Sequence, residues 1–96
     1  MGIEIDQGYG ASEADAVTEL REGGFSAEVK EYAPGTTEPH AHDHEVRLFI
    51  LDGEFRLLDA DRDELHTCRP GDRVRVSAGT RHSEDHGALK MVVGRR

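Results

Sequence analysis

Short alternating segments separated by turn residues run through most of this 96-residue chain and constrain its fold most strongly. From Phe25 onward, apolar and polar residues alternate over stretches of roughly four to eight residues, which is the pattern of a half-buried β-strand. Turn signals such as Pro34-Gly35, Asp52-Gly53 and Pro70-Gly71 recur roughly every eight to ten residues. The pattern predicts an all-β fold, a jelly-roll barrel or sandwich of about eight antiparallel strands.

The N-terminal part has a different pattern. Residues 1–11 are rich in glycine and show little periodicity, so we expect a loose arm with a short strand at Ile3–Ile5. Ser12 is a good helix N-cap and is followed by acidic residues, which suit the first turn of a helix. Gly23-Gly24 supplies a stop signal. The sequence therefore predicts a short helix over residues 12–22, packed on the outside of the sheet.

Composition limits the partners and the surroundings of the chain. Residues 1–96 are expected to form one domain, with the barrel at 25–94, and an apolar fraction of 35% predicts a thin core that a homodimer interface would supplement. A net charge of −8 disfavours nucleic acid as a partner. No apolar run resembles a signal peptide or a membrane span, so we expect a cytoplasmic protein without membrane contact. The single cysteine, Cys68, is expected to fill the core.

Histidines are concentrated in two short segments. His40, His42 and His44 alternate over five residues, and the segment 82–86 repeats that spacing with His-Ser-Glu-Asp-His. In an extended strand every second side chain points the same way, so each segment presents its polar groups to one side. If the segments are neighbours, their imidazoles suit a divalent metal such as Fe, Mn, Ni, Zn or Cu. The candidate ligands by this argument are His40, His42, His44, His82, Glu84 and His86.

The first segment resembles the first motif of the cupin superfamily, in which a glycine precedes His-x-His, a glutamate and a second glycine. The matching residues are Gly35, His40, His42 and Gly53. The position of the metal-binding glutamate of the family is occupied by Val46. Glu45 is one residue out of register, and a shift of one residue on a strand sends the side chain to the opposite face unless a bulge re-aims it.

The second segment resembles the second motif of the same superfamily. The matching residues are Gly71, Gly79 and His82. Ser77 replaces the family's proline, and His86 replaces its asparagine, where it is expected either to line the pocket or to be exposed. Strand parity points Glu84 the same way as His82, so Glu84 can supply the missing carboxylate, as in small cupins whose second motif ends in His-x-Glu. The resemblance implies a small cupin with metal ligands His40, His42, His82 and Glu84, and with His44, His86 and Glu45 as weaker candidates.

Three imidazoles with one carboxylate leave open positions on the metal, which is typical of a catalytic site. We therefore expect a metal-dependent enzyme that acts on a small chelating molecule. A three-histidine site resembles cupin thiol and diketone dioxygenases, and isomerisation or hydrolysis by a redox-inert metal is equally open. The alternatives are a non-catalytic ligand-binding or metal-binding module and a scaffold without metal. An anionic substrate has candidate anchors in Arg47, Arg73, Arg75 and Arg81, of which parity places Arg73 and Arg75 outward.

Overall fold

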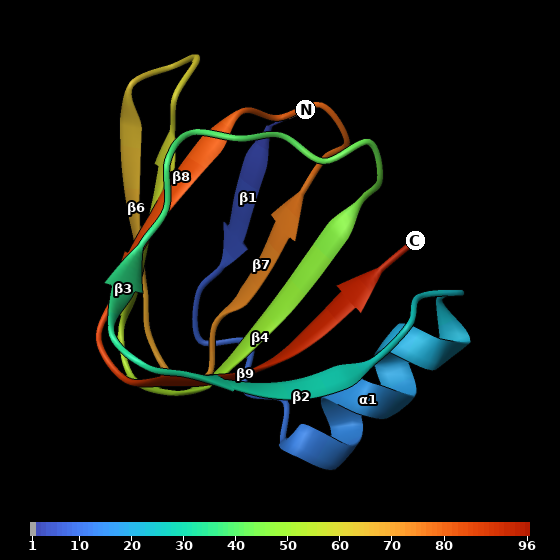
Figure 1. The fold of residues 1–96 in the computed structure, drawn as a ribbon. Coiled ribbons are helices and arrows are strands. Elements are labelled where there is room, and N and C mark those ends of the chain that lie inside the picture. The colour runs from blue at the N-terminus through green and yellow to red at the C-terminus, as the bar shows by residue number, and fades with distance from the viewer. Residues whose placement is uncertain (1) are drawn as a thin grey trace.

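The computed structural model describes residues 2–96, which form nine strands and one helix (Figure 1). The elements are β1 (Ile3–Asp6), α1 (Glu13–Glu22), β2 (Glu28–Tyr32), β3 (Gly35–Thr36), β4 (Val46–Asp52), β5 (Phe55–Asp59), β6 (Glu64–Cys68), β7 (Arg73–Val76), β8 (His82–His86) and β9 (Leu89–Arg95). Five strands form one antiparallel sheet in the order β1-β7-β4-β9-β2, and four form another in the order β3-β8-β5-β6. This confirms the predicted all-β jelly-roll architecture with a short N-terminal helix.

The core lies between the two sheets. Leu48 on β4 and Met91 on β9 extend from the five-stranded sheet, and Phe55 and Leu57 on β5 extend toward them from the other sheet. Cys68 is fully buried in this cluster, and burial raises the pKa of its thiol to about 12. This burial confirms the predicted role of Cys68 as a core residue, and a thiol with a raised pKa stays protonated at neutral pH.

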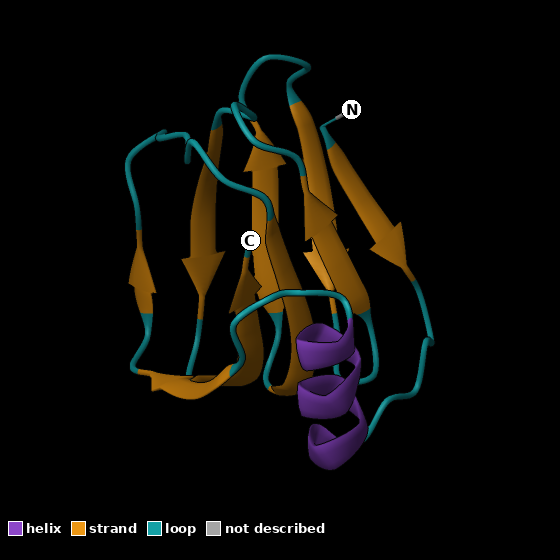
Figure 2. Cartoon of the chain, turned by 90° about the vertical axis from the view of Figure 1, so that its right-hand side faces the viewer, coloured by secondary structure: helices purple, strands orange, loops and turns teal. Residues whose placement is uncertain are grey.

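Helix α1 covers the outer face of the five-stranded sheet (Figure 2). The Ser12 hydroxyl accepts a hydrogen bond from the third residue of the helix, as an N-cap does. Leu20 packs against Phe49 and Val92, which face outward from β4 and β9. The approach is close at Gly94, where a Cβ would lie 2.5 Å from Cδ2 of Leu20. The one helix described within residues 2–96 is too short and too polar to span a membrane.

The N-terminal part confirms one expectation and corrects another. The short strand expected at Ile3–Ile5 is present as β1, which extends to Asp6 and pairs with β7 as the edge of the five-stranded sheet. Phe25 was predicted to begin a strand, but its N–H donates to the carbonyl of Leu20, so it belongs to the turn that leaves the helix. The strand β2 therefore begins at Glu28. The ring of Phe25 is buried between the guanidinium groups of Arg47 and Arg96, at 4.5 and 4.6 Å.

Candidate metal centre

Backbone hydrogen bonds hold the two histidine segments side by side, as the sequence predicts. The N–H of His40 donates to the carbonyl of His82, and the N–H of His82 donates to the carbonyl of His40, both at 2.8 Å. The N–H of Gly79 donates to the carbonyl of His42, also at 2.8 Å. The first segment is a loop with this single bridge rather than the expected strand. Pro39 has no N–H to donate to a ladder, and the loop bends around the turn between β7 and β8.

The rings of His40 and His82 are oriented by the same kind of hydrogen bond, from Nδ1 to the backbone carbonyl two residues earlier. Nδ1 of His40 lies 2.8 Å from the carbonyl oxygen of Glu38, and Nδ1 of His82 lies 3.0 Å from that of Thr80. A carbonyl oxygen only accepts, so in the neutral rings the proton sits on Nδ1 and donates to it. Each Nε2 then carries a free lone pair, which is the tautomer that a metal ligand requires.

Three imidazoles converge at this end of the barrel. One ligand nitrogen from each of His40, His42 and His82 lies within 4.8 Å of the other two. The ring centroids are 4.5 Å apart for His40 and His82, 5.1 Å for His40 and His42, and 5.5 Å for His42 and His82. His82 is 4% exposed, whereas the other two rings are half-buried. The cluster is therefore anchored in the protein interior on one side and is accessible to solvent on the other.

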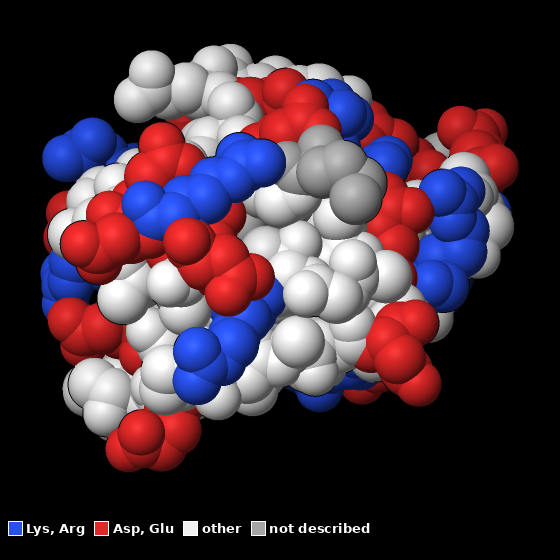
Figure 3. Space-filling model, turned by 90° about the horizontal axis from the view of Figure 1, so that it is seen from above, with Lys and Arg blue, Asp and Glu red and all other residues white. Residues whose placement is uncertain are grey.

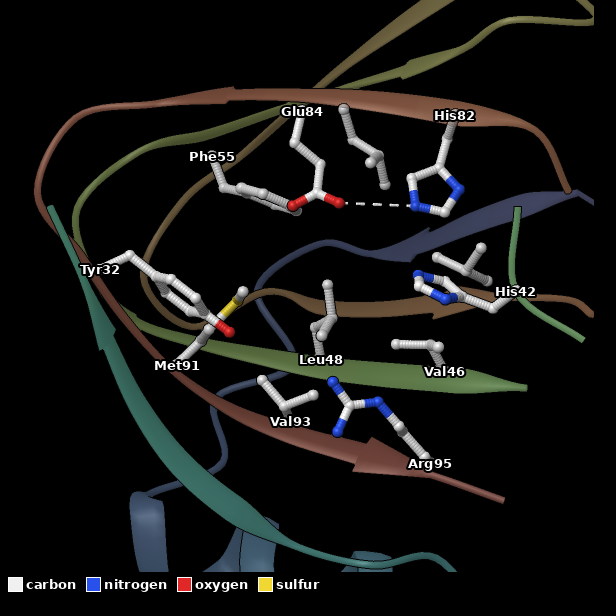
Figure 4. Close-up of a pocket in the computed structure, with 12 residues that line it drawn as sticks. Tyr32, His42, Val46, Leu48, Phe55, His82, Glu84, Met91, Val93 and Arg95 are labelled. Atoms are coloured by element: carbon white, nitrogen blue, oxygen red, sulfur yellow. Dashed lines mark ion pairs between the residues drawn. The ribbon is translucent and has the colours of Figure 1, made fainter. Parts of the chain in front are cut away.

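Glu84 places a carboxylate beside two of these rings. It is two residues beyond His82 on β8 and points the same way, as strand parity predicts. Its Oε2 lies 3.5 Å from Nε2 of His82 (Figure 4). The same oxygen lies 3.3 Å from Nε2 of His40. The carboxylate therefore faces the nitrogen atoms that the Nδ1 hydrogen bonds leave free.

The ionisation of the cluster reflects these contacts. The hydrogen bond with Glu84 raises the pKa of His82 against the opposing effect of burial, and the same bond lowers the pKa of Glu84. Burial lowers the pKa of His42, and the neighbouring His40 and His82 lower it further. These contacts thus favour the neutral form of His42 and the protonated form of His82 beside the Glu84 carboxylate.

The donor set fits a divalent first-row transition metal. Imidazole nitrogen and carboxylate oxygen are ligands that Fe, Mn, Ni, Zn and Cu accept. Free lone pairs on His40 and His82 converge at a half-buried point next to a carboxylate. A cation at that point would satisfy all of these acceptors. Without a cation, a neutral Nε2 and the Glu84 carboxylate are both acceptors, so one ring must be protonated to donate a hydrogen bond to Glu84.

The weaker candidates lie outside the three-histidine group. The His44 ring contacts His42 at a centroid distance of 5.1 Å, but its Nδ1 meets Asp43, and its buried Nε2 has no hydrogen-bond partner within residues 2–96. His86 lies at the other end of β8, with its ring against Tyr32 at 5.8 Å. Glu45 pairs with Arg96 at 2.7 Å. His66, expected to have no role, lies on β6 and is absent from the group that converges within the described residues.

Arg73 and Arg75, two of the four candidate substrate anchors, form ion pairs on the outer face of the five-stranded sheet. Arg73 binds the carboxylates of Asp6 and Glu19, each at 2.8 Å, and Arg75 pairs with Asp6 at 3.0 Å. Arg47 lies over the ring of Phe25, as described above. Arg81 is exposed in the turn before β8. The outward direction expected for Arg73 and Arg75 is confirmed, and these residues do not line the cavity described next.

A cavity of about 80 Å³ opens between the two sheets next to the histidines. Sequence reasoning missed two of its polar residues, Tyr32 on β2 and Arg95 on β9. The alternation of β9 carries the signal for Arg95, because Leu89, Met91 and Val93 share its parity. The cavity-lining residues are Tyr32, His42, Val46, Leu48, Phe55, Leu57, Val76, His82, Glu84, Met91, Val93 and Arg95.

Residues 28–91 match the sequence family described as Cupin domain, which is two thirds of the chain. This chain belongs to the cupin family. No curated protein sequence matches it significantly. In this cupin, Val46 stands at the position of the family's first-motif glutamate and is buried at the cavity wall. The carboxylate beside the histidines comes instead from Glu84 in the second motif.

Solved structures share the cupin fold with this chain at low sequence identity. The polyketide cyclase RemF from Streptomyces resistomycificus is 24% identical with a TM-score of 0.65, and the match covers 74% of this chain and 53% of the cyclase. A DUF861 family protein from Thermotoga maritima is 15% identical with a TM-score of 0.69, covering 95% and 96%. A cupin-2 domain protein from Shewanella frigidimarina is 17% identical with a TM-score of 0.62, covering 75% and 71%. This cupin thus spans about half the length of the cyclase.

Proposed function

We propose that this cupin binds one divalent metal ion through His40, His42, His82 and Glu84, and that the bound metal acts on a small chelating molecule. The observation that carries the proposal is the pair of Nδ1 hydrogen bonds to the carbonyls of Glu38 and Thr80. These bonds direct Nε2 of His40 and of His82 at the carboxylate of Glu84. Outer hydrogen bonds of this kind fix the ring and raise its basicity as a ligand.

The chain supplies a setting for chemistry beside the cluster. A metal bound there would polarise an oxygen, nitrogen or sulfur atom of the substrate as a Lewis acid. Leu48, Phe55 and Val93 give the adjacent cavity an apolar wall, which limits water around a bound molecule. Burial raises the pKa of Tyr32 and the charge of Glu84 raises it further, so this phenol remains a neutral hydrogen-bond donor toward a ligand in the cavity.

Metal content tests the proposal directly. Protein purified without an affinity tag or chelators is expected to carry about one divalent ion per chain by elemental analysis. His40→Ala and His82→Ala should lose that ion, while His66→Ala, a half-buried histidine on a different strand, should retain it. Circular dichroism of each variant checks that the fold is intact. Retention of the metal by a folded His82→Ala variant would overturn the assignment.

Two assays distinguish a reaction that consumes oxygen from a redox-neutral reaction at the proposed metal site. Oxygen uptake by the Fe(II) form with diketones or thiols would indicate a dioxygenase. Conversion of an enolisable substrate by the Zn(II) form without oxygen would indicate isomerisation or a related redox-neutral reaction. The second class has support from the shared fold with a polyketide cyclase. Tight ligand binding with no turnover in either form would instead assign the alternative, a non-catalytic binding module.

A further inference from the structure

Arg95 occupies a position where the alternation of its strand calls for an apolar residue. Met91 and Val93 precede it at the same parity on β9 and are buried between the sheets. Arg95 stands opposite Val46 in the β4–β9 pair and lines the same cavity as His42. The Arg95 side chain is 42% exposed, so its guanidinium keeps contact with solvent while it lines the cavity.

The partner that Arg95 has in this structure is a weak one. Its backbone is fixed, because its N–H donates to the Ser26 hydroxyl and its carbonyl accepts from the Ser26 N–H. Its Nη1, however, lies 3.7 Å from Oε1 of Glu28, with side-chain exposures of 42% and 56%. The neighbouring Arg96 pairs with Glu45 at 2.7 Å on the opposite face. A long, solvated pair contributes little and leaves most of the guanidinium donors available.

The charge of Arg95 is local to the cavity. Figure 3 looks down on the end of the molecule that carries the histidine loop and shows acidic and basic side chains intermixed around an uncharged centre. The whole chain carries a net charge of −8, so no broad positive field collects anions. Figure 4 shows the Arg95 guanidinium among the cavity-lining residues, near Val93 and Leu48.

We propose that the cavity selects small organic acids, with Arg95 binding a carboxylate at one end of the ligand while the histidine cluster takes chelating oxygen atoms at the other. This inference rests on the proposed metal site and adds the class of substrate to it. The apolar side chains of Val46 and Val93 lie between the two polar ends and fit a short hydrocarbon body. The planar fork of arginine matches a carboxylate with two parallel hydrogen bonds.

Hydroxamates with and without a terminal charge test this pairing. Malonic, succinic and glutaric monohydroxamates chelate through one end and carry a carboxylate at the other, and the terminal amide of each is its neutral isostere. Titration calorimetry on the Zn(II)-loaded protein at low ionic strength should show at least one acid binding about fivefold to tenfold more tightly than its amide. Arg95→Gln should bring that ratio to about one, and Arg95→Lys should restore part of it.

Arg96→Gln is the matched control, because it removes the same charge from the adjacent residue on the opposite face. It should keep the preference for the acid, which separates a local contact from an effect of net charge. Equal binding of all three acids and their amides to the wild-type protein would overturn the anion subsite while leaving the metal site in place. A preference that survives in Arg95→Gln would overturn it as well.

A metal-free experiment separates this inference from the proposed function. If the protein binds no zinc, the metal proposal fails, and hexanoate then probes the carboxylate subsite alone. Methyl resonances of Met91 and Val93 should shift with hexanoate in the wild-type protein and stay unchanged in Arg95→Gln, in agreement with the subsite. Methyl shifts that are absent in the wild type, or that are the same in Arg95→Gln, would refute it.

Discussion

Replacing Glu84 by glutamine removes a charge from the centre of the cluster without changing the shape of the side chain. The Glu84 side chain is 22% exposed, and its Oε2 lies 3.3 and 3.5 Å from the Nε2 atoms of His40 and His82. If Glu84 is a ligand, the neutral amide keeps one weak oxygen donor and loses the attraction between the carboxylate and a divalent cation. We therefore expect Glu84→Gln to fold and to bind the metal less tightly.

The size of the loss follows from the position of the charge. Two unit charges about 4 Å apart interact by about 4 kcal/mol at the effective dielectric constant near a protein surface. The cation is divalent, which increases this value, while desolvation of the carboxylate, partial exposure and the remaining amide oxygen reduce it. A net loss of about 2–3 kcal/mol is expected, which is a roughly 30- to 150-fold increase in the dissociation constant.

Competition with a fluorescent zinc chelator measures the dissociation constant over this range. Glu45→Gln is the control, since it makes the same substitution at a glutamate that lies next to the first histidine segment but pairs with Arg96 at 2.7 Å. Its metal affinity should remain within about twofold of the wild type, because the Glu45 carboxylate pairs with Arg96 and not with the histidine rings. A loss in Glu45→Gln that equals or exceeds the loss in Glu84→Gln would remove Glu84 from the ligand set.

Three further predictions concern stability and assembly. Gly94→Ala should destabilise the fold by about 1–3 kcal/mol in urea unfolding, because its Cβ collides with α1, whereas Gly87→Ala, with open space around it, should be neutral. Burial raises the pKa of Asp6, but hydrogen bonds from Arg73 and Arg75 outweigh it and hold the pKa below 3.8. The ionised carboxylate therefore stabilises the fold above pH 3.8, and this contribution is lost as the pH falls through the lowered pKa. In Asp6→Asn, the free energy of unfolding should fall less steeply on acidification. Light scattering at micromolar concentration should give the mass of a homodimer, and a single monomer mass would contradict that prediction.

The parts of the fold that follow from local chemistry were predictable from the sequence. Alternation and turn residues indicate the strands because each inward side chain must be apolar, and a hairpin such as Asp52-Gly53 needs its glycine, which has φ +88° here. Parity on β8 places Glu84 beside His82 for the same geometric reason. Phe25 was misassigned because it alternates with its neighbours yet completes the exit turn of a helix, a tertiary contact that a period of two does not reveal.

The site itself was only partly predictable. The course of the loop that carries His40 and His42 depends on bonds to β8 and to the turn before it, which no local pattern contains. Arg95 follows Val93 in an apolar alternation, but a charged residue near the end of a strand is typical of a solvent-exposed position. The alternation alone leaves these two readings open, and the pairing of β4 with β9, which places Val46 opposite Arg95, decides between them.

Anomalous diffraction from crystals of the zinc-loaded protein tests the central claim most directly. One strong peak is predicted between the two histidine segments, about 2.0–2.1 Å from a nitrogen of each of His40, His42 and His82. Zinc peaks confined to surface carboxylates, with the three rings in their present positions and no peak between them, would contradict the account.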